Sequence, residues 1–216
     1  MKVFEMLIPM TIEGLKTTIG VFLVTLIFSI PLSIIVAKLR MSKNKAIANI
    51  TGTYIYIMRG TPLLLQLMFI FFGFHFVPVI GFAFGRYQAI FIAFILNYTA
   101  YFAEIFRGGI NSIDVGQVEA STVLGLSKTF TFMKVILPQV IKNVMPSIGN
   151  EVITLVKDTS LVYILGVADA LKAAKSVSNT YSTFIPYIFI GFVYLVIIAF
   201  LTKILGNVEK RFSYYR

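Results

Sequence analysis

Residues Gly116–Gln139 read GQVEASTVLGLSKTFTFMKVILPQ, a semi-polar stretch between two long apolar runs. Gln117–Gly125 is predicted to form a short helix, with Glu119 in its first turn, where a carboxylate favours the positive end of the helix dipole. Gly125 is suited to end this helix in a left-handed conformation, which costs little without a Cβ. A second helical segment is expected from about Ser127. The stretch therefore predicts a helix–turn–helix inside an otherwise very hydrophobic chain.

The composition of the whole chain favours a membrane protein. Of 216 residues, 58% are hydrophobic and 13% are charged, whereas a soluble domain carries roughly 25% charged residues. At roughly 20 residues per crossing, the length allows about five or six helices and leaves no room for a separate catalytic domain. The absence of Cys excludes disulfides and thiol chemistry. The net charge of +10 is attributed to residues that flank the spans, because no basic run is long enough to bind nucleic acid.

We expect an all-α integral membrane protein, with residues 1–216 forming a single domain. Pro138 marks the entry to the fourth span, and Pro31 is expected to kink the first. A short helix over Ala46–Met58 is expected to precede a break at Arg59–Pro62. An amphipathic interfacial helix is predicted over Val167–Thr183. Its charged residues Asp169, Lys172 and Lys175 are expected on a solvated face, with contact to an external protein as the alternative. The predicted transmembrane helices are Gly14–Ala37, Leu63–Ile80, Gln88–Phe106, Ile136–Leu161 and Pro186–Leu205.

Five spans place the two termini on opposite sides of the membrane. If residues 38–59, residues 107–142 and the tail from residue 203 are cytoplasmic, they hold thirteen of the 19 basic residues. The positive-inside tendency then favours an external N-terminus and a cytoplasmic C-terminus, with the helix–turn–helix inside. Physical arguments alone leave two interpretations of that element open: a helix that docks into a groove of another protein, or an ordinary interfacial helix.

The spacing within the stretch resembles a known motif. Glu119-Ala120, Gly125 six residues after Glu119, and Leu137-Pro138 twelve residues after Gly125 resemble the EAA loop of bacterial ATP-binding-cassette (ABC) importer permeases. Val135 stands where that pattern usually has Ile. Other segments are similar, in the same order, to the polar amino acid permeases within this family. They are RGTPLLLQL (Arg59–Leu67), YFAEIFRGGINSID (Tyr101–Asp114), LPQVIKNVMPSIGNEVI (Leu137–Ile153) and KDTSLVYILG (Lys157–Gly166).

The resemblance implies a type I importer transmembrane domain whose loop at about 108–138 couples to an ATPase subunit dimer. It also implies a second permease copy or close paralogue, an extracytoplasmic amino acid-binding protein and a place in the bacterial cytoplasmic membrane. ATP and Mg would bind the partner ATPase, since this chain has no GxxxxGK[ST] phosphate loop. No catalytic residue, metal site or cofactor is expected in the chain itself. The implied ATPase-coupling residues are Gly116, Gln117, Glu119, Ala120, Ser121, Leu124, Gly125 and Leu126.

Ionisable side chains at membrane depth are costly and usually face a bundle interior or a water-filled cavity. The excess of such acids over bases suggests a cationic substrate such as arginine, lysine or histidine. Alternatives remain for individual residues: Glu104 can pair with Arg107 three residues later, and Glu151 can make a structural hydrogen bond. The hydroxyls of the KDTSL segment are expected to rebind backbone groups at an unwound turn. The candidate substrate-binding residues are Gln66, Asn97, Glu104, Glu151, Asp158, Thr159, Ser160 and Leu161.

His75 is expected to be an interfacial residue of the outer loop. Gly108 and Gly109 are expected to give the third span a flexible exit. The competing functional class is an ion-gradient-driven secondary amino acid transporter or a channel subunit, which would need coupling-ion ligands and usually more spans.

Overall fold

The computed structural model describes residues 2–73 and 84–212, and the regular elements of these ranges are all helical. Among the described residues, α1, α4 and α9 are long and apolar enough to cross a membrane. The pair α2 and α3, bent by 105°, is a fourth candidate. In chain order the α-helices are α1 (Lys2–Arg40), α2 (Lys45–Gly60), α3 (Leu63–Phe72), α4 (Arg86–Asn111), α5 (Val115–Val123), α6 (Lys128–Phe130), α7 (Leu137–Asp158), α8 (Ala170–Tyr181) and α9 (Ile185–Phe212). A π-helical segment, Thr131–Ile136, joins α6 to α7, and a 3-10 segment, Thr159–Leu165, follows α7.

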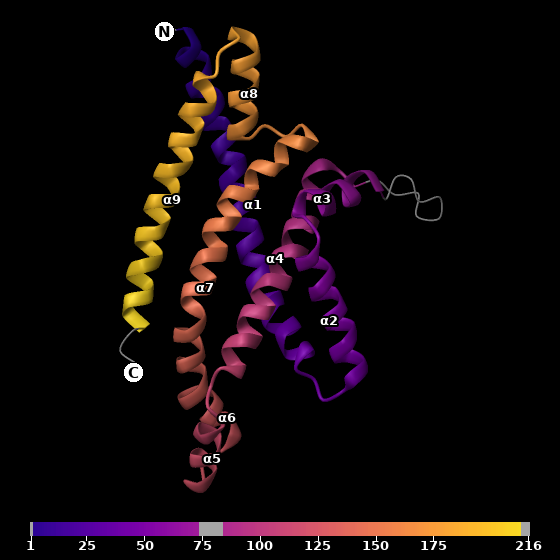
Figure 1. Cartoon of the computed structure of the whole chain (residues 1–216), viewed down its shortest axis with the longest axis vertical. Helices are drawn as coiled ribbons and strands as arrows, with labels where there is room; N and C mark the ends of the chain where they lie inside the picture. Colours follow the sequence, from indigo (N-terminus) through magenta and orange to yellow (C-terminus); the bar gives the residue numbers. More distant parts are fainter. Residues whose placement is uncertain (1, 74–83, 213–216) are drawn as a thin grey trace.

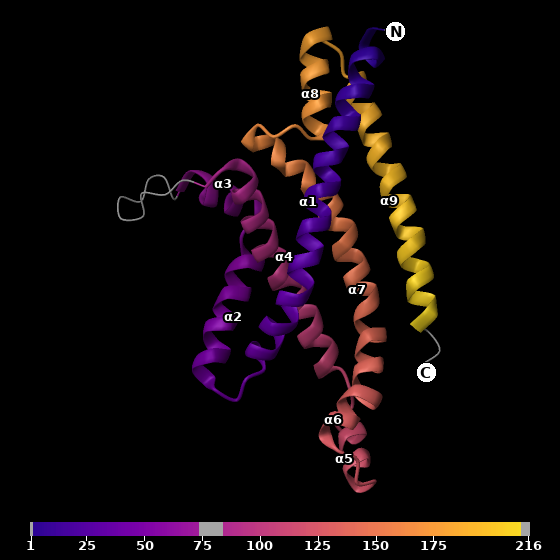
Figure 2. The same ribbon diagram turned by 180° about the vertical axis from the view of Figure 1, so that it is seen from behind.

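The long helices run roughly side by side, with α4 in contact with α1, α2, α3 and α7 (Figure 1). The short helices α5 and α6 lie at one end of the molecule, and α8 lies at the opposite end beside the N-terminus; Figure 2 shows the same arrangement from behind. These two ends are called the α5 end and the α8 end below. Buried side chains of α4, including Phe94, Tyr98 and Phe102, form the centre of the core.

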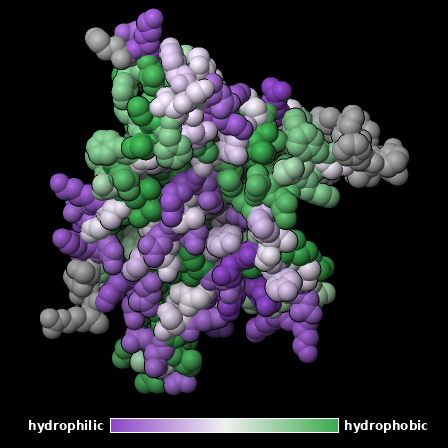
Figure 3. Space-filling view, turned by 45° about the horizontal axis from the view of Figure 1, so that its top comes forward, coloured by the Kyte–Doolittle hydropathy of each residue, from purple (hydrophilic) through white to green (hydrophobic). Residues whose placement is uncertain are grey.

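The outer helices expose large apolar side chains, as expected of surfaces that face lipid. On α9 these include Ile188, Phe192, Leu195 and Phe200. In Figure 3 hydrophobic side chains gather above and to the right, whereas hydrophilic side chains cover much of the middle and left of the face.

The predicted spans overlap the observed helices but differ in their bounds. α1 begins at Lys2, well before the predicted start at Gly14, because the polar residues of this segment do not interrupt a helix. Glu13 and Lys16 pair at 2.6 Å on its exposed surface. The described part of the predicted second span is α3, which ends at Phe72; the rest of that prediction, and His75, lie outside the described residues. The helices predicted at Gln88–Phe106, Ile136–Leu161, Val167–Thr183 and Pro186–Leu205 correspond to α4, α7 with the 3-10 segment, α8 and α9.

A polar network stabilises the break between α2 and α3. In a continuous helix the carbonyl of Met58 would accept a hydrogen bond from residue 62, but Pro62 has no N–H to donate. The side chains of Gln66 and Asn97 donate to this carbonyl instead, at 2.9 and 3.0 Å. Asn97 also donates to the Gln66 side-chain oxygen at 3.0 Å. Two of the candidate substrate residues thus hold the bend that places the start of α3 beside α4.

The helix–turn–helix predicted from Gly116–Gln139 is confirmed, with one correction. Asp114 caps α5 by accepting from the Gly116 N–H at 2.6 Å, so the helix starts at Val115 and Glu119 lies in its second turn rather than its first. At the other end Gly125 has a φ of +71°, and the Leu126 N–H donates to the Ser121 carbonyl at 3.0 Å. This is the bonding of a Schellman turn.

The chain after this turn stays helical into α7. The Ser127 hydroxyl accepts from the Phe130 N–H at 3.2 Å and starts α6. Pro138 lies in the first turn of α7, as predicted, but the π-helical segment before it keeps the backbone helical. A π-bulge relieves the clash that a proline makes with the preceding turn. The α5 turn is therefore connected to α7 by continuous helix rather than by a flexible link.

At the α8 end, two backbones touch. A Cβ on Gly14 of α1 would lie 2.4 to 2.6 Å from backbone atoms of Asp169 and Ala170. Asp169 caps α8 through bonds from the N–H groups of Leu171 and Lys172 and is buried, so the expectation of a solvated Asp169 was wrong. Burial raises the pKa of this carboxyl above its ordinary value, and the two capping bonds act in the opposite direction.

Candidate functional site

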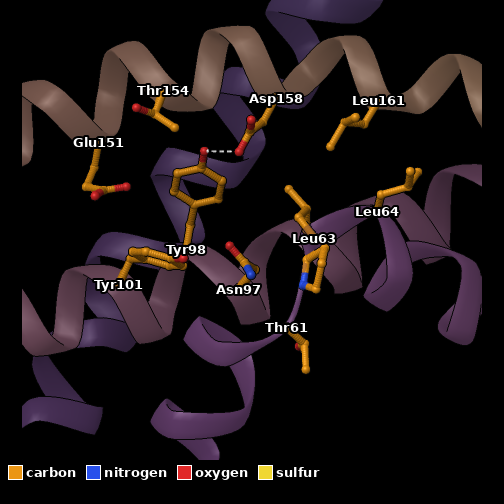
Figure 4. Close-up of a pocket in the computed structure, with 11 residues that line it drawn as sticks. Thr61, Leu63, Leu64, Asn97, Tyr98, Tyr101, Glu151, Thr154, Asp158 and Leu161 are labelled. Atoms are coloured by element: carbon orange, nitrogen blue, oxygen red, sulfur yellow. Dashed lines mark hydrogen bonds between the residues drawn. The ribbon is translucent and has the colours of Figure 1, made fainter.

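A cavity of about 300 Å³ lies between the start of α3, the middle of α4 and the second half of α7 (Figure 4). Its size is at the lower limit of the usual range for small-molecule sites, roughly 300 to 1,000 Å³. Polar groups enter it from α4 and α7, and apolar side chains close it near α3. Its lining residues are Thr61, Pro62, Leu63, Leu64, Asn97, Tyr98, Tyr101, Glu151, Thr154, Asp158 and Leu161. We refer to it as the Asp158 cavity.

Two carboxylates of α7 face this cavity. Glu151, Thr154 and Asp158 are three and four residues apart, a spacing that brings them to one face of a helix. The Tyr98 hydroxyl of α4 donates to Asp158 Oδ2 at 2.8 Å, and Figure 4 shows this bond across the cavity. Glu151 has no hydrogen-bond or ion-pair partner among the described residues. The described lining thus contains two acids and no base.

The opposite wall carries the start of α3. Thr61 and Pro62 are extended, no side chain caps the helix, and the first intrahelical bonds come from Leu65 and Gln66 to the Pro62 carbonyl. The N–H groups of Leu63 and Leu64 therefore precede the first helical hydrogen bond, where the helix dipole is positive. The guanidinium of Arg59 lies over the Tyr101 ring, 5.4 Å from its centroid, beside this wall. The cavity has an acidic side on α7 and a positive side at the α2–α3 break.

The structure brings together four of the eight candidate substrate residues in this cavity: Asn97, Glu151, Asp158 and Leu161. Gln66 belongs to the network behind the α2–α3 break. Thr159 is fully buried and its hydroxyl donates to the Val156 carbonyl at 2.6 Å. Ser160 donates to the Lys157 carbonyl at 2.7 Å and lines a different cavity, against α8 and α9. These two hydroxyls bind backbone groups where α7 changes to the 3-10 segment, as expected of the KDTSL segment.

Glu104 lies outside the Asp158 cavity and pairs with Arg107. Arg107 Nε donates to Glu104 Oε2 at 2.9 Å, and its Nη2 donates to Glu104 Oε1, so the pair is bidentate. Glu104 lines a second cavity of about 260 Å³ between α4 and α7, nearer the α5 end. The ion-pair alternative for Glu104 is thereby confirmed.

Sequence reasoning missed several lining residues, of which Tyr98 is the most important. Nothing in the sequence alone reveals a contact between Tyr98 and Asp158, sixty residues away. Thr154 could have been found, because it lies on the same helical face as Glu151 and Asp158. The contribution of Thr61 and Pro62 depends on the 105° bend, which the sequence indicates only as a break.

The described residues of the α5 end form an exposed surface with apolar and polar groups. Val123 and Leu124 are 86% and 74% exposed, whereas Ser121 is buried and its hydroxyl donates to the Gln117 carbonyl at 2.7 Å. Glu119, Ala120 and Gly125 are exposed on the same short element. A protruding helix with exposed apolar side chains is the kind of surface that docks into a groove of a partner.

Comparisons with known proteins agree on one class. The model of a family described as "Binding-protein-dependent transport system inner membrane component" matches residues 29–214. The arginine transport system permease protein ArtQ of Bacillus subtilis is 37% identical over 206 residues, which cover 94% of this chain and 93% of that protein. The putative glutamine transport system permease protein GlnP of Rickettsia conorii is 35% identical over 201 residues, covering 93% and 91%.

Two solved structures of ABC transporters contain chains that are similar to this one. A crystal structure of an amino acid ABC transporter with histidines contains a chain with a TM-score of 0.86 and 34% identity, and the match covers 94% of both chains. An inward-facing structure of the MetNI methionine ABC transporter matches with a TM-score of 0.74 at 14% identity and therefore shows likeness of fold alone.

Proposed function

Because the chain belongs to the family of inner membrane components of binding-protein-dependent transport systems, we propose that it is the permease subunit of an ATP-driven importer of polar, cationic amino acids. In this family ATP hydrolysis takes place on a separate subunit, and the chain is a transport subunit rather than an enzyme. ATP and Mg are therefore assigned to the partner ATPase.

The observation that carries the substrate class is the pair of acids, Glu151 and Asp158, on the wall of a cavity whose described lining has no base. A carboxylate at membrane depth is stabilised by an opposite charge or by hydrogen bonds. Tyr98 supplies one such bond to Asp158, and a guanidinium or ammonium group between the two carboxylates would neutralise both. A relative of the chain is named for arginine transport, which agrees with this chemistry.

The α-carboxylate of such a substrate suits the cavity wall at the start of α3, opposite the two acids of α7. An α-carboxylate would lie near the N–H groups of Leu63 and Leu64, at the positive end of α3, with Arg59 close by. Helix ends at breaks within a membrane are suited to anionic groups of substrates in this way. The α-carboxylate and the cationic side chain of a basic amino acid thus find complementary groups on two facing walls.

The remaining parts of the proposal concern the assembly. The α5 end is assigned to docking on the ATPase. The chain crosses the membrane five times, with α2 and α3 counted together as one span. The N-terminus is assigned to the outside and the C-terminus to the cytoplasm. Two permease copies, or this chain and a close paralogue, form the membrane part, and an external binding protein delivers the substrate. A rigid α6–α7 connection would carry movement of α5 directly to the helix that bears Glu151 and Asp158.

Arginine uptake into liposomes that contain the complete transporter tests this function. Glu151→Gln and Asp158→Asn each remove one charge from the cavity, and we expect KM for arginine to rise about 30-fold, equivalent to about 2 kcal/mol. Uptake should require ATP and stop with vanadate. Unchanged arginine uptake in both variants would reject the cationic substrate, and uptake that depends on an ion gradient instead of ATP would reject the importer.

A further inference from the structure

The Asp158 cavity and the cavity at Glu104 lie along the same pair of helices. On α4 their lining residues follow one helical face, from Asn97 through Tyr101 and Glu104 to Gly108 and Ser112. Spacings of three and four residues keep these positions in line, and fifteen residues extend about 22 Å along a helix. The two cavities are therefore successive parts of one polar strip that leads toward the α5 end.

The facing strip on α7 has the same character. Asn143 and Ser147 line the Glu104 cavity, and Glu151, Thr154 and Asp158 line the Asp158 cavity. All five positions are again three or four residues apart. The Asn143 side chain donates to the Ser112 hydroxyl at 3.0 Å and joins the two helices at the end of the strip.

Gly108 contributes no side chain to this strip. A glycine inside a helix is unfavourable relative to alanine and is normally explained by a close contact or by a positive φ. Neither applies to Gly108, because a Cβ at this position would meet nothing within 4 Å and its φ is not positive. Its neighbour Gly109 is explained by packing, since a Cβ there would lie 2.1 Å from Val144 Cγ1. The missing side chain of Gly108 instead leaves room in the Glu104 cavity.

Glu104, which lines this cavity, already binds a guanidinium group, that of Arg107. Arg107 meets Glu104 through its Nε and Nη2 atoms, which is the bidentate contact that a free arginine guanidinium makes with a carboxylate. The side chains of Glu104 and Arg107 are 25% and 32% exposed, so water reaches both partners. Because a substrate guanidinium would make the same bidentate contact with Glu104, its exchange with Arg107 would leave the charge of Glu104 equally well neutralised.

We propose that Glu104 is a second cation-binding position on the route from the Asp158 cavity to the α5 end, and that Arg107 occupies it until a substrate cation replaces it. This inference rests on the proposed transport of cationic amino acids. Glu104 receives the substrate side chain after it leaves Glu151 and Asp158, and the return of Arg107 releases it. The exchange keeps Glu104 neutralised throughout and prevents it from trapping the substrate.

Equilibrium binding of radiolabelled arginine to the purified complex of permease and ATPase subunits, without ATP and without the external binding protein, tests the exchange. The wild type should saturate at one arginine per permease subunit, because Arg107 blocks the second position. Arg107→Gln should bind two, and the double variant with Glu104→Gln should bind one again. One arginine per subunit in Arg107→Gln would overturn the second position, whereas no binding by the wild type would contradict the proposed substrate itself.

Uptake kinetics provide an independent measurement. Glu104→Gln should lower kcat for arginine about tenfold and leave its binding to the Asp158 cavity within twofold. Glu13→Gln breaks an exposed pair with Lys16 at the same spacing and serves as the matched control, with unchanged kcat. Equal losses of melting temperature and uptake in Glu104→Gln and Arg107→Gln, as from a broken structural ion pair, or wild-type kcat in Glu104→Gln, would overturn the proposal.

Discussion

The contact between Gly109 of α4 and Val144 of α7 sets how closely these two helices approach beside the Glu104 cavity. A Cβ added at Gly109 would lie 2.1 Å from Val144 Cγ1 and 3.4 Å from Val140 Cγ1. Carbon atoms in contact prefer about 3.5 to 4.0 Å. Because valine is confined to essentially one χ1 rotamer in a helix, Val144 cannot turn aside, and the helices must separate.

The expected cost follows from this geometry. Overpacking a close contact costs about 1 to 3 kcal/mol, and replacing a helical glycine with alanine returns up to about 1 kcal/mol. The central values of these two ranges give a net loss of about 1.5 kcal/mol for Gly109→Ala, which corresponds to a fall in melting temperature of about 3 to 6 °C for a chain of this size. Gly108→Ala, where the new Cβ meets no atom within 4 Å, should keep or raise the melting temperature.

The melting temperatures of both variants are measured on the purified permease in the same detergent, with the loss of helix monitored by far-UV circular dichroism. Val144→Ala removes the clashing methyl group, so the double variant with Gly109→Ala should recover at least half of the loss. The account is contradicted if Gly109→Ala melts at the same temperature as Gly108→Ala, or if adding Val144→Ala to Gly109→Ala does not raise the melting temperature. Either result would mean that the close contact between α4 and α7 does not require glycine at position 109.

Three further predictions concern the two ends of the molecule and the cavity. Gly14→Ala should lower the melting temperature by several degrees because its Cβ would collide with the α8 backbone, whereas Gly20→Ala, with nothing within 4 Å, should not. Gly125→Val should weaken co-purification of the ATPase and uptake, since a β-branched residue strains the left-handed turn by at least about 1 kcal/mol, and Gly125→Asn should retain most of both. Tyr98→Phe should raise KM for arginine about threefold to tenfold through the lost bond to Asp158.

Each of these three predictions can be contradicted by a specific result. Equal melting temperatures for the two α1 variants would contradict the α1–α8 contact. Normal ATPase retention and uptake in Gly125→Val would remove the α5 turn from coupling. A fall in kcat at unchanged KM in Tyr98→Phe would mean that the tyrosine acts on a later step than arginine binding.

Local features of the fold were predictable where a single residue type determines the backbone. Gly125 indicated the left-handed turn, Pro62 indicated the restart of a helix, and the hydroxyls of the KDTSL segment indicated the change at the end of α7. The start of α5 was misplaced because Asp114, its actual cap, was not considered as one. The predicted first span, Gly14–Ala37, covers only part of α1, which extends from Lys2 to Arg40 with an exposed Glu13–Lys16 pair on its surface.

The candidate site was predictable only in part, because it depends on contacts between distant segments. Glu151 and Asp158 were identified by the cost of burying a charge in a membrane, which sequence alone reveals. Tyr98 and the start of α3 join them only through the packing of α4 and the 105° bend. Asn97 and Gln66 were identified as polar groups at depth, but their bonds to the Met58 carbonyl follow from the three-dimensional position of the break.

The central claim is that the Asp158 cavity holds a cationic amino acid in one orientation. A cryo-EM structure of the complete transporter with bound arginine tests this most directly. We predict the guanidinium between Glu151 and Asp158, and the α-carboxylate at the N–H groups of Leu63 and Leu64. Arginine bound in the reverse orientation, or bound only outside the cavity between α3, α4 and α7, would contradict the account.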